Sequence, residues 1–221
     1  MNKKFNSIRY YKDFTIGNTE KIRINKLLKL IGTNKKVLDI GCGDGFISEL
    51  ILKNNNDVYG IEIAEDAIKK ARNKGITIYD LDLNLDWCNN LQEKFDVVFA
   101  GEIIEHVFDT DKFLKNIHRV LKKDGYIVLS TPNVASLGRR ILLLLGKNPL
   151  IETTARSYDA GHIRYFTYKT LKKLLEENNF KMKYFTSDCI NFNANGLIKS
   201  KLGAIFFPKM GRSLIIKAVK K

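Results

Sequence analysis

A short apolar segment followed by three alternating glycines constrains this chain more than any other feature. Residues 37–45 read Val-Leu-Asp-Ile-Gly-Cys-Gly-Asp-Gly. An apolar run that ends in Gly-x-Gly-x-Gly predicts a strand turning tightly into a helix, here Phe46 to Lys53, because glycine accepts positive φ and lets a ligand lie against bare backbone. A dinucleotide turn of the form G-x-G-x-x-G needs glycine where this chain has Phe46. The sequence therefore disfavours a dinucleotide, and Asp39 before the first glycine favours a ligand that carries a cation.

Further apolar segments repeat the strand and helix pattern along the chain. Strands are expected at Asp57 to Ile61, Gly75 to Tyr79 and Lys94 to Ala100, and a helix, a glycine turn and a fifth strand fill residues 117–133. Alternation of this kind predicts an α/β fold with a parallel sheet and helices on both faces. Residues 182–186 and 214–219 are expected to form the last two strands.

The glycine turn resembles the first motif of the class I S-adenosylmethionine-dependent methyltransferases, and residues 37–133 follow that family's motif order. The tail, with Gly-His-Ile-Arg-x-Phe-Thr at 161–167, resembles the broad type 11/23 group. The resemblance implies a Rossmann-like, doubly wound, mostly parallel seven-stranded sheet with an antiparallel last strand. It also implies S-adenosylmethionine as the cofactor, bound by Asp39, Gly41, Cys42, Gly43, Gly45, Glu62, Ile63, Asp82, Leu83 and Ala100.

Three of these residues have individual roles in the family. Glu62 ends the second strand, where an acid can accept hydrogen bonds from ribose hydroxyls. The resemblance implies that Ile63 faces the adenine and that an acid past the third strand receives the adenine amino group. We assign this last role to Asp82, with Asp80 as the competing residue.

A Glu-x-x-Glu-His pattern follows the fourth strand. If Glu102, Glu105 and His106 enter a helix, they share one face, at the edge of the sheet where ligands bind. The pattern resembles the ubiquinone-biosynthesis O-methyltransferases and the 3′-terminal small-RNA 2′-O-methyltransferases. The resemblance implies a divalent metal held by Glu102, Glu105 and His106, with His162 added in the RNA group. Sequence does not choose among Mg²⁺, Mn²⁺, Fe²⁺ and Zn²⁺.

Other interpretations of this pattern stay open. His106, with Glu105, is a candidate catalytic residue that takes the acceptor's proton as general base. The two glutamates also suit the first turn of a helix, where the helix dipole favours acids. On the acceptor side we place Tyr11, His162 and Arg164; Tyr10 and Tyr11 form either an aromatic lid or a surface-packed pair.

We expect one methyltransferase domain over residues 1–221. Residues 1–33 form an N-terminal cap helix region, 34–133 the cofactor-binding core, 134–166 a substrate-side insertion, and 167–221 a C-terminal helix with the last strands. The apolar run Ile141 to Leu145 is compatible with a substrate lid or a membrane contact. A buried helix is the favoured interpretation, because five consecutive apolar residues turn through every side of a helix.

The net charge of +14 comes from 38 Lys and Arg against 24 Asp and Glu. Most of the basic residues are lysine, which carries less specific recognition of nucleic acids than arginine, so a nucleic-acid partner is disfavoured without being excluded. No secretory leader or membrane-spanning run is visible, and the three cysteines lack disulfide or metal spacing. We expect a cytoplasmic protein, with no transmembrane segment but with peripheral membrane contact open.

These features predict an enzyme that methylates a hydroxyl group of a small molecule such as a sugar, a quinone or a related metabolite. The alternatives are a methyltransferase acting on the 3′-terminal 2′-hydroxyl of RNA, and a non-catalytic adapter that keeps the fold. The sequence makes no prediction about the oligomeric state.

Overall fold

A computed structural model describes residues 17–153, 161–192 and 198–221 of the chain. Seven strands form one sheet in the order β3–β2–β1–β4–β5–β9–β6. The first five strands are parallel to one another, and β9 is antiparallel to both β5 and β6. The strands are β1 (Lys36–Ile40), β2 (Asp57–Glu62), β3 (Thr77–Asp80), β4 (Phe95–Gly101), β5 (Leu121–Pro132), β6 (Phe180–Thr186) and β9 (Ser213–Lys220). The predicted fold class is confirmed, including the antiparallel last strand.

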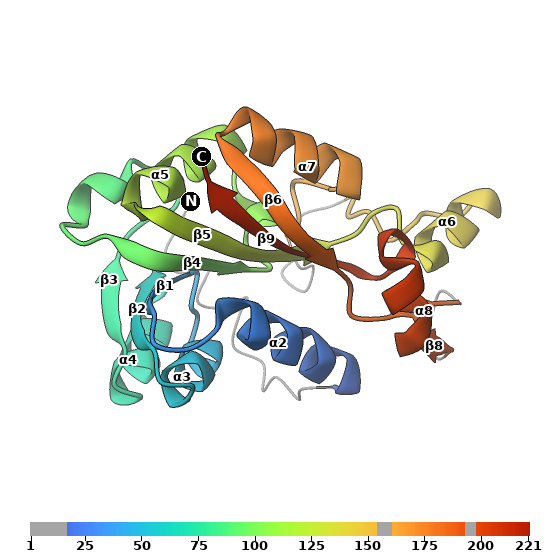
Figure 1. The fold of residues 1–221 in the computed structure, drawn as a ribbon. Helices are drawn as coiled ribbons and strands as arrows, with labels where there is room; N and C mark the ends of the chain where they lie inside the picture. The colour runs from blue at the N-terminus through green and yellow to red at the C-terminus, as the bar shows by residue number, and fades with distance from the viewer. Residues whose placement is uncertain (1–16, 154–160, 193–197) are drawn as a thin grey trace.

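Helices cover both faces of the sheet (Figure 1). One face carries α2 (Asn18–Ile31), α3 (Phe46–Lys53) and α4 (Glu65–Asn73), and the other carries α5 (Thr110–Val120) and α7 (Tyr168–Glu177). Each face has its own apolar core, and the central strands β1 and β4 are almost entirely buried. Burial on both sides explains why these strands read as continuous apolar runs in the sequence.

Local sequence signals fix where the helices begin. The side chain of Asp109 accepts a hydrogen bond from the backbone N–H of Lys112 at 2.9 Å and caps α5. Thr167 and Thr170 form a reciprocal capping box at the start of α7. Gly45 precedes α3 in the left-handed conformation, with φ of 76°, as the glycine turn predicted.

Smaller elements lie at one end of the molecule, at the right of Figure 1. They include α6 (Leu137–Leu144), α8 (Lys201–Phe206) and the two-stranded sheet of β7 (Ile190–Asn191) and β8 (Lys199–Ser200). The described chain also has three short 3₁₀ helices: η1 (Trp87–Asn90), η2 (Ile104–His106) and η3 (Pro208–Met210). No helix in the described ranges is both long enough and apolar enough to cross a membrane.

The favoured burial of the Ile141 to Leu145 run is wrong. Only Leu142 is buried, while Leu143, Leu144 and Leu145 are 65%, 85% and 63% exposed. The reason is that α6 packs along one side only and ends at Leu144, so that no element among the described residues covers its last residues.

Candidate active site

A cavity of about 600 Å³ opens at the carboxyl ends of β1, β2 and β4. This is the edge where parallel α/β sheets bind ligands. Seven of the ten predicted cofactor residues line it: Gly41, Cys42, Gly43, Glu62, Ile63, Asp82 and Leu83. The same cavity is lined by Glu102, His106 and Gly161, so the glycine turn and the Glu-His segment face one space.

The three glycines of the turn have different physical roles. Gly43 has φ of 56°, and a Cβ there would meet no atom within 4 Å, so its backbone borders open space in the cavity. At Gly41 a Cβ would lie 2.7 Å from Cδ1 of Ile103. At Gly45 it would lie 3.0 Å from the backbone of Ala71 on α4. Gly43 is therefore the position at which a ligand can approach the backbone.

Glu62 ties the glycine turn to the end of β2. One carboxylate oxygen accepts the backbone N–H of Gly43 at 3.0 Å, and the other accepts those of Ile63 and Ala64 at 2.8 and 2.9 Å. A carboxylate has about four lone-pair sites, so these three bonds leave capacity for a further donor such as a ribose hydroxyl. The carboxylate also fixes the shape of the turn.

Three predicted cofactor residues lie behind the cavity wall. Ala100 is fully buried in the core, and Gly45 packs against α4. Asp39 is 2% exposed and accepts a hydrogen bond from Oγ of Ser48 at 2.6 Å. Burial raises the pKa of Asp39 to about 7, and the nearby charge of Glu62 adds to the shift. The geometry therefore supports a role for Asp39 in holding the turn and the start of α3.

The structure distinguishes the two candidate acids at the end of β3, Asp80 and Asp82. Asp82 lines the cavity, and its carboxylate accepts hydrogen bonds from the backbone and side-chain amides of Asn84 at 2.9 and 3.0 Å. Asp80 is the last residue of β3, pairs in register with Glu62, and is not among the lining residues. The geometry agrees with the choice of Asp82, while the contact with adenine stays a prediction.

The expected helical face of Glu102, Glu105 and His106 is wrong. Glu102 is left-handed, with φ of 55°, and only Ile104–His106 form a helical turn, which is η2. The cause is that β4 continues its pairing past Gly101: the backbone N–H of Glu102 donates to the carbonyl of Ser130 at 2.9 Å, and the chain turns only after this bond. The carboxylate of Glu102 instead binds Arg23 at 2.7 Å and Oγ of Ser130 at 2.8 Å.

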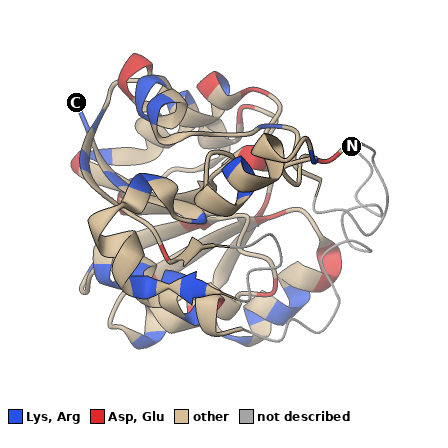
Figure 2. Cartoon of the chain, turned by 90° about the vertical axis from the view of Figure 1, so that its right-hand side faces the viewer, with Lys and Arg blue, Asp and Glu red and all other residues tan. Residues whose placement is uncertain are grey.

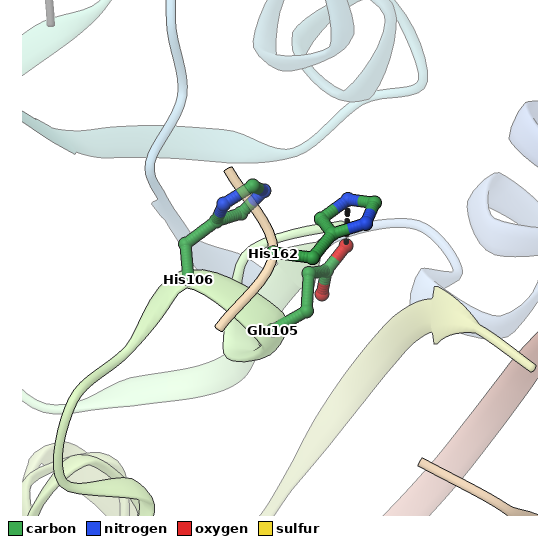
Figure 3. Close-up of side chains that lie close together, drawn as sticks. All are labelled: Glu105, His106 and His162. Atoms are coloured by element: carbon green, nitrogen blue, oxygen red, sulfur yellow. Dashed lines mark ion pairs between the residues drawn. The ribbon is translucent and has the colours of Figure 1, made fainter. Parts of the chain in front are cut away.

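The other three predicted metal ligands do converge (Figure 3). Glu105, His106 and His162 each offer a ligand atom, and these atoms lie within 4.8 Å of one another. The two imidazole rings are 5.0 Å apart between centroids. The carbonyl of Glu105 accepts the backbone N–H groups of Ile163 and Arg164 at 2.9 and 3.0 Å, which brings this distant segment to η2. Glu102 is outside the group.

Glu105 is a buried acid in an unusual setting. It is 1% exposed, and one carboxylate oxygen accepts a hydrogen bond from Oγ1 of Thr131 at 2.8 Å. The other oxygen has no hydrogen-bond partner in the described part of the chain and lies 3.9 Å from Nε2 of His162. Burial, with a smaller contribution from the charge of Glu102, raises the pKa of Glu105 to about 8. A cation beside this oxygen would offset the cost of burying its charge.

Hydrogen bonds orient both histidine rings. Nδ1 of His106 lies 3.1 Å from the carbonyl oxygen of Gly161. Since a carbonyl only accepts, Nδ1 carries the hydrogen and, in the neutral ring, Nε2 carries the lone pair. Nδ1 of His162 lies 3.3 Å from Glu152, whose other carboxylate oxygen accepts the backbone N–H groups of Gly161 and His162 at 2.7 and 3.2 Å.

The remaining acceptor-side predictions have different outcomes. Arg164 is exposed, does not line the cavity, and donates from Nη2 to the carbonyl of Phe108 at 2.6 Å. Tyr11 lies outside the described residues. Arg23 and Glu152 are not indicated by the sequence, because nothing near them signals contact with residues so far along the chain.

Comparison with known proteins places the chain in a family. The model of the methyltransferase domain family matches residues 20–184. The ubiquinone biosynthesis O-methyltransferase of Pelagibacter ubique is 35% identical over 84% of this chain and 75% of its own. The enzyme of the same name from Haemophilus ducreyi is 36% identical over 53% of each chain, so this chain spans about half the length of that relative.

Solved structures agree at the level of the fold. An S-adenosylmethionine-dependent methyltransferase from Archaeoglobus fulgidus superposes with a TM-score of 0.63 at 22% identity, covering 92% of this chain and 95% of that one. Magnesium protoporphyrin IX methyltransferase from Synechocystis, solved with bound S-adenosylhomocysteine, gives a TM-score of 0.61 at 19% identity and covers 96% and 92%. The family match, the curated relatives and the ligand-sized cavity beside the glycine turn lead to one conclusion: this chain belongs to the class I S-adenosylmethionine-dependent methyltransferases.

Proposed function

We propose that this protein transfers the methyl group of S-adenosylmethionine to a hydroxyl oxygen of a small-molecule acceptor. The observation that carries the proposal is the shared cavity, which the glycine turn lines from one side and His106 from another. The relatives named ubiquinone biosynthesis O-methyltransferase support a quinone-type phenol as the acceptor.

The lining residues indicate which part of the cavity would hold the cofactor. Gly43 offers bare backbone, Glu62 offers carboxylate oxygen to ribose hydroxyls, and Asp82 with Leu83 borders the third strand's end. S-adenosylmethionine held by these residues would supply its methyl group to the part of the cavity that Glu102 and His106 line, in the segment after β4.

The reaction is a displacement at the methyl carbon. The acceptor oxygen forms a bond to the methyl carbon while the carbon–sulfur bond breaks. The electron pair of the broken carbon–sulfur bond stays on the sulfur, which gives S-adenosylhomocysteine. Alignment of oxygen, carbon and sulfur supplies much of the rate acceleration. The acceptor's proton must leave, and we assign it to Nε2 of His106, whose tautomer is set by the carbonyl of Gly161.

Glu105 acts in this scheme as a positioning residue. Its backbone carbonyl holds residues 163 and 164, and its carboxylate faces His162 from within the protein. Because Glu105 is buried and bonded to Thr131, it does not itself meet the acceptor.

A divalent metal ion is the second arrangement that the cluster supports. Glu105, His106 and His162 would hold it, and the unpartnered buried oxygen of Glu105 fits such a ligand. One carboxylate with two imidazoles suits manganese, iron or zinc more than magnesium. When bound, such an ion lowers the pKa of a coordinated hydroxyl. Glu102 is not part of this set because Arg23 pairs with it.

The test combines cofactor binding with an acceptor screen. S-adenosylhomocysteine should bind in calorimetry, and a methyl-transfer assay should give product with catechol- or quinol-type phenols rather than with sugars or RNA ending in a ribose diol. His106→Gln should lower kcat by about 10²-fold or more, the usual contribution of a general base. The matched control is His118→Gln, since His118 lies on α5 against Phe180 and outside the cavity.

Each alternative has its own signature in this screen. Turnover of RNA with an intact terminal diol, with none on phenols, would identify an RNA methyltransferase. Binding of S-adenosylhomocysteine without turnover of any acceptor would identify a non-catalytic adapter. Equal loss of turnover in the His106 and His118 variants would contradict the role assigned to His106.

A further inference from the structure

Exposed apolar side chains gather in two segments of the described chain. Of the eighteen large apolar residues that are exposed in the described ranges, twelve lie within residues 143–151 and 192–210. Soluble proteins expose single apolar residues everywhere, but a concentration of this kind marks an interaction site. The most exposed include Leu143, Leu144, Leu145, Leu202, Phe206 and Phe207, at 62% to 85%. We call residues 143–151 and 198–210 the α6–α8 surface.

The two helices of this surface are anchored to the protein by other residues. Leu142 of α6 and Ala204 of α8 are buried. Both helices pack against β7, where Ile190 is also buried, and they lie at the same end of the molecule (Figure 1). The exposed leucines and phenylalanines are therefore the outer sides of helices whose inner sides are already packed.

The α6–α8 surface is also basic. Its residues, 143–151 and 198–210, include no Asp or Glu and four lysines, Lys147, Lys199, Lys201 and Lys209, and α6 adds Arg139 and Arg140 just before them. All but Arg139 are exposed. Figure 2 views the molecule from this end and shows Lys and Arg on helices that face the viewer. Leucine and phenylalanine beside lysine and arginine is the composition of helices that lie in the interface of a membrane.

We propose that the α6–α8 surface docks the protein onto an anionic lipid bilayer. Apolar side chains enter the boundary between headgroups and acyl chains, and the surrounding basic groups pair with anionic headgroups. A second copy of this chain is a poorer occupant, because each copy carries a net charge of +14 and would bring one basic surface against another. A bilayer matches both the apolar and the charged character of the surface.

The surface runs directly into the acceptor side of the cavity. Ile151, which is 37% exposed, is followed by Glu152, whose carboxylate holds the backbone of Gly161 and His162. Docking therefore brings the acceptor side close to the bilayer. The surface shares no residue with the cavity lining, so lipid binding and cofactor binding can be measured separately.

The experiment is sedimentation of the full chain with vesicles of phosphatidylcholine alone or with phosphatidylglycerol. We expect binding to the mixed vesicles only, weakened by high salt because charge pairing is screened. The double variant Leu144→Asn with Phe206→Asn should lower the apparent affinity at least tenfold. Leu85→Asn, which changes a residue that is 61% exposed outside the surface, should bind like the parent. All variants should bind S-adenosylhomocysteine like the parent, which separates this result from the fate of the methyltransferase proposal.

The charge contribution has its own variant, Lys147→Glu with Lys201→Glu, which should abolish the preference for phosphatidylglycerol. Parent-like vesicle binding by the Leu144 and Phe206 double variant would overturn the proposal. So would failure of the parent to bind mixed vesicles. Light scattering supplies a further check: a dimer of the parent that dissociates in the same double variant would assign the surface to a second copy.

Discussion

Gly43 is the position where the protein leaves space for a ligand against its backbone. We expect Gly43→Ala to weaken S-adenosylhomocysteine binding at least tenfold in calorimetry, because the new methyl group enters the cavity. Gly75→Ala is the matched control. Gly75 also has positive φ and open space around its Cβ, but it lies outside the cavity.

Both substitutions place alanine in a left-handed conformation, so both should lower the free energy of unfolding by about 1–2 kcal/mol. Only Gly43→Ala should affect the ligand. Equal binding by the two variants would show that the cofactor lies elsewhere.

Asp39 gives a pH dependence whose sign follows from its burial. Its pKa is raised from 3.8 to about 7, so the folded protein holds a proton that the unfolded chain releases. The stability that this proton contributes is fully present below pH 3.8 and is lost as the pH rises toward 7. Over that range the free energy of unfolding falls by roughly 4 kcal/mol at most.

We therefore expect Asp39→Asn to gain stability relative to the parent as the pH rises from 4 to 7, measured by urea unfolding. Asp57→Asn, at an exposed position in β2, is the control for the exchange of an acid for an amide. A parent-to-variant difference that stays constant over this range would contradict the protonated state of Asp39.

The cluster of Glu105, His106 and His162 makes chelation informative. If His106 acts as the base without metal, EDTA should leave turnover unchanged. If the cluster holds an ion, EDTA should abolish turnover, manganese or zinc should restore it, and His162→Ala should remove the metal from purified protein as measured by elemental analysis. Glu102→Gln should retain the metal, since its carboxylate is paired with Arg23.

At the level of elements, α7 offers a test of local stability. Thr167→Ala removes the side chain that caps the backbone N–H of Thr170 at 3.2 Å. We expect a loss of about 1 kcal/mol in the free energy of unfolding, with S-adenosylhomocysteine binding unchanged. Lys169→Ala, at an exposed position in the same helix, should cost much less. Comparable losses in the two variants would argue against the capping box as the cause.

Elements with a strong periodic or turn signal were predictable from the sequence. The glycine turn, the central strands and α7 each carry a local signal: alternating glycines, mostly apolar runs, and a threonine cap before an apolar stripe. The antiparallel β9 followed from the family resemblance, and the structure confirms it.

The errors arose where tertiary contacts override local sequence. Glu102 could not be placed because its conformation depends on a hydrogen bond to Ser130 on another strand. The exposure of Leu143 to Leu145 depends on which elements pack beside α6, which no local pattern reports. The family resemblance predicted that His162 lies near His106. It did not predict the backbone hydrogen bonds from Ile163 and Arg164 to the carbonyl of Glu105, which bring the two histidines together.

At the scale of the whole molecule, α2 connects the cavity to the C-terminal segments. Its Arg23 pairs with Glu102 in the cavity, its Glu20 pairs with Arg212 at 3.0 Å, and its Lys26 donates to the carbonyl of Ser187 at 2.5 Å. Through α2, the lining of the cavity is therefore linked to the C-terminal part of the chain.

We expect S-adenosylhomocysteine to raise the Tm of the entire domain in a single transition. At a ligand concentration one hundred times Kd, the added stability is about 2.7 kcal/mol. NADH at the same concentration should leave Tm unchanged, since Phe46 occupies the position of the third dinucleotide glycine. A comparable shift with NADH would overturn the ligand assignment of the glycine turn.

The place of β9 in the sheet has a consequence for how the protein folds. β9 lies between β5 and β6 although both precede it in the chain, and within the described residues β6 pairs in the sheet only with β9. The five parallel strands can assemble first, but completing the sheet requires a later segment to insert between two others, a slow step of high contact order. Until it does, two strand edges are open to neighbouring chains. Aggregation during refolding is thus a hazard of a half-formed intermediate, and the insertion of β9 covers the two edges that cause it.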